Sequence, residues 1–147
     1  MGKILCATRG GPAAVEAQEA AIERALEQDD DLIFFYVVNV EFLSHAHYAL
    51  RSDVVTEQMD HMAEFLMTMA VERAEAKGKA ARYVIKHGDF APELKKTVRE
   101  EGITLVVLGR PAHENSVFRL ESLRRFAGKI AAETGVEVWI PGLEEHH

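Results

Sequence analysis

Four arginines of this sequence could together hold an anionic ligand. They are Arg9, Arg110, Arg124 and Arg125. The first two each follow an apolar run (KILCAT and TLVVLG), and the other two stand further on in an amphipathic stretch (VFRLESLRRFAGKI). Guanidinium groups bind phosphate through paired hydrogen bonds, and the N-terminus of a helix adds N–H donors and partial positive charge. If the fold brings these side chains into one crevice, they predict an anion site.

A plainer interpretation of the arginines stays open. Glu114, Glu121 and Glu133 are near enough in sequence to pair with them, and most surface charges simply face water. Arg124 and Arg125 are also adjacent, so they point in different directions on a helix. Surface ion pairs alone would then account for the arginines.

Motifs for the common catalytic and cofactor chemistries do not occur in the sequence. It contains no G-x-S-x-G, H-E-x-x-H, C-x-x-C or G-x-x-x-x-G-K-[ST], and no G-x-G-x-x-G follows the first apolar run. Cys6, within that run, is expected to be a buried small hydrophobe rather than a nucleophile. His45 and His47 could bind a metal only with further ligands, so no metal is expected.

Length, charge and cysteine content restrict the class of protein. The 147 residues fit one domain spanning 1–147, and a net charge of −7 disfavours binding to nucleic acid or to an anionic membrane. The N-terminal residues lead directly into a strand pattern without a signal peptide, and a single cysteine fits a reducing compartment. A cytoplasmic location is therefore expected.

Five short apolar runs alternate with helical patterns. The predicted strands are Lys3–Thr8, Leu32–Val38, Ala81–Lys86, Thr104–Leu108 and Val136–Ile140. The helices are predicted from Pro12, from about Val54 to Lys77, between Asp89 and Gly102, and from the end of a polar loop over Gly109–Glu121 to Gly135. Two strand segments, LIFFYVV and TLVVL, are apolar throughout, which indicates strands covered on both faces. The alternation predicts an α/β fold with a parallel sheet between helices.

The second helical pattern is rich in methionine. Its apolar positions at helical spacing are Met59, Met62, Ala63, Leu66, Met69 and Ala70. Methionine fills irregular gaps in cores, so this stripe is expected to be buried. Two long irregular segments, Asn39–Ser52 and Gly109–Glu121, each follow a strand, at the edge of the sheet where α/β proteins bind ligands.

Four segments resemble, in order, those of the universal stress protein family. They are KILCATRGGPAAVEAQEAAIERAL, LIFFYVVNV, YVIKHGDFAPELKKTVREEGITLVVLGRPAH and ETGVEVWIP. The resemblance implies a three-layer α/β/α sandwich with four helices and a five-stranded parallel sheet of order 3-2-1-4-5. It also implies a crevice between the ends of the first and fourth strands.

One branch of that family binds ATP in this crevice through the pattern G-x2-G-x9-G-[ST]. By position, the residues of this chain at that site are Ala7, Thr8, Arg9, Val37, Gly109, Arg110, Ala112, Arg124 and Arg125. Arg9 replaces the family's aspartate, Ala112 its second glycine, and Arg124-Arg125 its Gly-[Ser/Thr] pair. Counting forward from Gly109 would instead place Ser122-Leu123 at that pair, which also lacks the glycine.

These departures predict loss of the ATP-binding mode, because glycines let backbone N–H groups approach phosphate and side chains block that approach. No cofactor is therefore expected. The favoured function is a non-enzymatic regulatory or stress-response module that can bind a signalling protein. The alternative is a nucleotide- or anion-binding switch with a remodelled arginine-rich site. An ATP hydrolase or phosphotransferase is disfavoured, since no general base stands beside a metal-binding carboxylate.

The fifth predicted strand would form an edge of the sheet. Its apolar residues are Val136, Val138, Trp139 and Ile140. An exposed apolar edge strand favours pairing with a second copy, and family members commonly dimerise there. A homodimer through this strand is therefore expected, unless the tail Pro141–His147 covers the edge.

Overall fold

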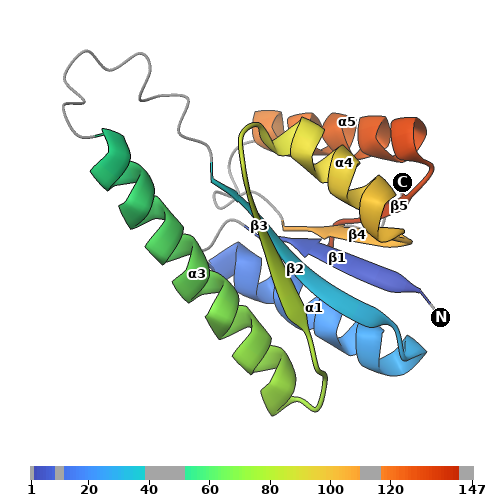
Figure 1. Ribbon diagram of the computed structural model, residues 1–147. Helices are drawn as coiled ribbons and strands as arrows, with labels where there is room; N and C mark the ends of the chain where they lie inside the picture. The colour runs from blue at the N-terminus through green and yellow to red at the C-terminus, as the bar shows by residue number, and fades with distance from the viewer. Residues whose placement is uncertain (1, 9–11, 39–51, 110–116, 143–147) are drawn as a thin grey trace.

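The computed structural model describes residues 2–8, 12–38, 52–109 and 117–142. Strands and helices alternate along these residues (Figure 1). In chain order they are β1 (Lys3–Ala7), α1 (Pro12–Gln28), β2 (Asp31–Val38), α3 (Ser52–Ala76), β3 (Arg82–His87), α4 (Phe90–Glu101), β4 (Leu105–Leu108), α5 (Val117–Thr134) and β5 (Glu137–Trp139). Each predicted strand is present, and no strand end differs by more than one residue from the one expected.

The sheet has five parallel strands in the order β3-β2-β1-β4-β5, with β1 at its centre. Helices α1 and α3 cover one face, and α4 and α5 cover the other (Figure 1). The predicted three-layer α/β/α fold, its four helices and its strand order are thus confirmed. Since β1 pairs with β2 on one side and β4 on the other, its C-terminal end lies at the point where the chain direction across the sheet reverses.

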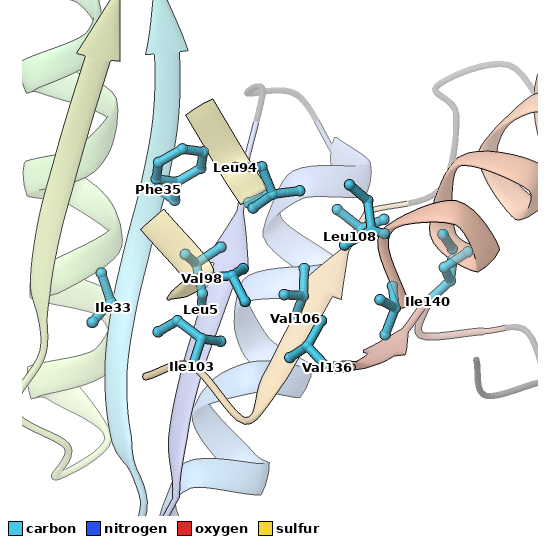
Figure 2. Packing of buried hydrophobic residues seen from close by; sticks show 14 residues of the cluster. Leu5, Ile33, Phe35, Leu94, Val98, Ile103, Val106, Leu108, Val136 and Ile140 are labelled. Atoms are coloured by element: carbon cyan, nitrogen blue, oxygen red, sulfur yellow. The ribbon is translucent and has the colours of Figure 1, made fainter. Parts of the chain in front are cut away.

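Alternation along β1 divides the core into two clusters. Leu5 and Ala7 belong to the cluster under α4 and α5, whereas Ile4 and Cys6 belong to the cluster under α1 and α3. Figure 2 shows the first cluster, in which Leu94 and Val98 of α4 pack over the central strands. Cys6 is fully buried, as predicted.

Alanine governs how closely the helices approach the sheet. In α1 the buried positions include Ala14, Ala17, Ala21 and Ala25. In α3 they are Ala63, Met67, Ala70 and Ala74. Small side chains allow close packing and have high helix propensity, and in α3 the four buried side chains form a narrow strip along the helix.

Two sequence predictions are corrected by this arrangement. The stripe of α3 was expected in the core, but the side chains of Met62 and Met69 are 57% and 41% exposed, because the alanines and Met67 occupy the buried strip. The loop expected over Gly109–Glu121 is shorter, because α5 already begins at Val117. The helix thus begins about one turn before Glu121, where the polar residues of the sequence had suggested that the loop ends.

Candidate functional site

The C-terminal ends of β1 and β4 lie side by side at one edge of the sheet. Ala7 pairs with Leu108, so Thr8 and Gly109 stand next to each other where the two strands end. Ala7 and Thr8 are buried and Gly109 is half-buried. The predicted neighbours from the first and fourth strands are therefore brought together.

Thr8 is held from within the protein. Its backbone N–H donates to the carbonyl of Phe35 in β2 at 3.0 Å, which continues the sheet for one residue beyond β1. Its Oγ1 accepts a hydrogen bond from Gln18 Nε2 of α1 at 3.1 Å. The backbone N–H and the side-chain oxygen of Thr8 therefore both form hydrogen bonds within the protein, at the strand end where the family resemblance places a ligand-binding residue.

Gln18 links this strand end to α3. Its side-chain oxygen accepts a hydrogen bond from the Arg73 guanidinium, while its amide donates to Thr8. Gln18 is only 4% exposed, so both bonds lie in or near the core. Neither Gln18 nor Arg73 was expected at the site. The available signal was a lone glutamine on the alanine-rich face of α1.

Val37 lies on β2, past the end of β1. It pairs with Lys86 of β3 and packs, partly buried, against the core cluster under α4 and α5. Since Phe35 pairs with Ala7, Val37 stands two residues further along the same direction. It therefore borders the predicted crevice with an apolar side chain.

The two arginines of α5 point to different sides of the helix. Arg124 is half-buried beside the positions that face the core, whereas Arg125 is exposed and lies opposite Ala127. Both stand within the helix, seven and eight residues after its first residue. Their backbone N–H groups are beyond the first turn and are used in helical hydrogen bonds.

Arg9, Arg110 and Ala112 lie outside the described residues, as do His45 and His47. Within the described ranges, no group of three His, Cys, Asp or Glu side chains could hold a metal ion. Burial raises the pKa of the Cys6 thiol to about 12, so this cysteine stays protonated.

The fifth strand places its apolar residues on two sides of the sheet. Val136, Val138 and Ile140 are each at most 6% exposed, within the core cluster under α4 and α5. Trp139 points to the opposite face and packs, partly buried, near α1, with the Arg24 guanidinium carbon 5.9 Å from its ring centre. A second copy pairing with β5 would thus contact its backbone and Trp139 rather than the three aliphatic side chains.

No helix among the described residues is long and apolar enough to cross a membrane.

Comparison with known proteins gives consistent results. The family model described as the Universal stress protein family matches residues 1–139. No curated protein matches the sequence. Among solved structures, a protein of the universal stress protein family from Burkholderia pseudomallei superposes with a TM-score of 0.75 at 20% identity, covering 97% of this chain and 96% of that one.

Two further structures are similar over almost the whole chain. The universal stress protein UspA from Lactobacillus plantarum gives a TM-score of 0.73 at 18% identity, covering 95% of this chain and 96% of that one. A universal stress protein family protein from Arabidopsis thaliana, with AMP bound, gives a TM-score of 0.63 at 14% identity, covering 95% of this chain and 90% of that one.

Proposed function

Because the chain belongs to the universal stress protein family, we propose that it is a homodimeric stress-response protein that regulates other proteins without catalysis. We further propose that it does not bind ATP in the manner of the family's ATP-binding branch. The two proposals rest on different features and are tested separately.

The position of Arg124-Arg125 within α5 is the main support for loss of ATP binding. A phosphate loop uses free backbone N–H groups, which only the first turn of a helix or an irregular loop provides. The residues at the family's Gly-[Ser/Thr] position lie further along α5, and so do Ser122 and Leu123, the pair given by the other count. Their N–H groups are engaged in the helix, so they cannot donate to phosphate.

The end of β1 adds a second argument. Thr8 bonds to Gln18 and to Phe35, and the next residue in the sequence is Arg9 where the ATP-binding branch has an aspartate. A guanidinium group carries only donors, so it can neither accept a hydrogen bond from a ribose hydroxyl nor bind a metal ion as a carboxylate does. Both departures support the proposal that the chain does not bind ATP in that mode.

Isothermal titration calorimetry tests this directly. The protein is titrated with ATP, AMP, cyclic AMP and inorganic phosphate, each with and without Mg²⁺, and no binding heat is expected from ATP. Micromolar ATP affinity would contradict the proposal. If AMP or phosphate binds and Arg9→Ala abolishes this binding, the alternative function, an anion-binding switch with an arginine-rich site, would be supported instead. AMP is included because the Arabidopsis thaliana relative holds it.

The dimer is supported by the edge position of β5 and by the partly buried Trp139. Parallel sheets with an open edge strand pair readily with a second copy. Light scattering at tens of micromolar should give twice the monomer mass. Since Trp139 is the only tryptophan, its fluorescence should shift to the red on dilution. A monomer mass at that concentration would refute the dimer.

A further inference from the structure

Three large apolar side chains form an exposed stripe along α3. Met62 is 57% exposed, Phe65 is 60% exposed and Met69 is 41% exposed. Their spacing of three and four residues puts them on one side of the helix. We refer to Met62, Phe65 and Met69 as the α3 stripe. It is separate from the buried strip of alanines and Met67 that contacts the sheet.

Two polar contacts show which way the α3 stripe faces. Asp60 bonds to His87 at 2.5 Å on the side of α3 toward β3, and Arg73 bonds to Gln18 on the side toward α1. Met69 stands one turn before Arg73, so it lies on nearly the same side of α3, the side toward α1. Phe65 lies further round the helix, away from the sheet. The exposure of all three side chains shows that the stripe is accessible from outside.

The helical layer that carries the stripe is strongly acidic. Among the described side chains of α1 and α3, the exposed glutamates are Glu16, Glu19, Glu23, Glu27, Glu57, Glu64, Glu72 and Glu75. The two arginines of these helices are Arg24, which lies over the Trp139 ring, and Arg73, which bonds to Gln18. The opposite layer is nearly balanced, with six basic and five acidic described side chains on α4 and α5. The layer of α1 and α3, which carries the stripe, is therefore the acidic layer of the protein, and Glu72 is the glutamate of α3 next to the stripe.

The size of the stripe limits what can bind to it. Large apolar side chains present about 150–250 Å² each, so the exposed part of the three amounts to roughly 300 Å². A stable dimer interface takes about 800 Å² per partner. A second copy is also disfavoured because pairing this face with itself would bring two acidic surfaces together. Anionic lipid is repelled for the same reason.

We propose that the α3 stripe binds a basic amphipathic helix of a partner protein. The apolar face of that helix would cover Met62, Phe65 and Met69, at the spacing by which helices recognise one another, and its Lys or Arg residues would face Glu72 and the acidic outer surface of α1 and α3. Glu72 stands three residues after Met69 and borders the stripe. This interaction depends neither on nucleotide binding nor on pairing of β5.

A synthetic peptide tests the interaction. The probe is a fluorescein-labelled helix of leucine and lysine, with leucines at positions i, i+3, i+4 and i+7, and binding is followed by fluorescence anisotropy. Phe65→Ala should weaken binding about tenfold, as expected for a central aromatic anchor, and Met62→Ala provides a second, independent variant. Circular dichroism verifies that both variants fold, which their exposed positions favour.

Matched charge reversals separate the stripe from general electrostatic attraction. Glu72→Lys on α3 should weaken peptide binding about threefold more than Glu100→Lys, which makes the same change at an exposed position of α4. A peptide of the same composition with its leucines scattered around the helix should bind at least tenfold more weakly, because it lacks an apolar face.

Several results would overturn the inference. One is absence of binding by the basic peptide, and another is equal binding by the scattered peptide or by an acidic analogue. Undiminished binding to both Phe65→Ala and Met62→Ala would exclude the stripe as the site. If Phe65→Ala instead lowers the mass of the protein in light scattering, the stripe contacts a second copy. If it abolishes binding to phosphatidylglycerol vesicles, the stripe contacts lipid.

Discussion

Replacing Gln18 by leucine tests the hydrogen bonds that join β1, α1 and α3. Leucine fills a similar volume, so little cavity results, but Thr8 Oγ1 loses its donor from Gln18 and Arg73 loses its acceptor. A buried neutral hydrogen bond contributes about 1 kcal/mol. The bond to the guanidinium would contribute more if fully buried, but water can reach the half-buried Arg73 and reduces its share to about 1 kcal/mol. We expect Gln18→Leu to lower the free energy of unfolding by about 2 kcal/mol.

Urea unfolding followed by circular dichroism at 222 nm measures this change, together with the melting temperature. A loss of about 2 kcal/mol corresponds to a melting temperature lower by about 6 °C for a chain of this size. A loss smaller than about 0.5 kcal/mol, the range of ordinary surface substitutions, would refute the importance of these bonds.

A double-mutant cycle with Thr8→Val isolates the bond between the two side chains. Removing both polar partners leaves neither group unsatisfied, so Thr8→Val/Gln18→Leu should be about 1 kcal/mol more stable than the sum of the single changes predicts. Strict additivity, within about 0.3 kcal/mol, would show that this hydrogen bond adds nothing.

Three further expectations concern single residues. The Cys6 thiol, whose pKa burial raises to about 12, should resist a thiol reagent at pH 8 until the protein unfolds, and rapid modification of the folded protein would contradict its burial. The hydrogen bond from Lys95 lowers the pKa of Glu133, so the ionised carboxylate stabilises the fold above the ordinary carboxyl pKa, and this contribution is lost as the pH falls through the lowered value. Lys95→Met should therefore make acid unfolding less steep, and an unchanged pH profile of stability would count against the pairing. Gly102→Ala should cost about 1 kcal/mol, because this residue ends α4 at φ 66° with open space around it, and a neutral result in urea unfolding would show that the backbone relaxes.

The sheet could be predicted because its strands are short, apolar and separated by recognisable helix ends. LIFFYVV and TLVVL indicated strands covered on both faces, and they contribute β2 and β4. The left-handed Gly102 marks the end of α4, as the sequence indicated. The strand order came from the family resemblance, since composition alone does not specify which strands are neighbours.

The environment of α3 could not be predicted in the same way. Apolar residues occupy more than half of its circumference, so the periodicity does not distinguish the buried strip from the exposed stripe. Packing decides in favour of Ala63, Ala70 and Ala74, whose small side chains let the helix approach β2 and β3. At the candidate site, the sequence identified the neighbouring strand ends but not Gln18, because a single glutamine in a helix usually faces solvent.

Exposure also decides which methionines an oxidant can reach. Met62 and Met69 are open to water, whereas Met67, on the same helix, is fully buried. Peroxide should therefore convert Met62 and Met69 to sulfoxides first, and reductase enzymes can reverse that change. A sulfoxide is polar, so oxidation would remove much of the apolar character of this side of α3 while the core remains intact. The oxidation state of Met62 and Met69 would then determine how apolar the α3 stripe is.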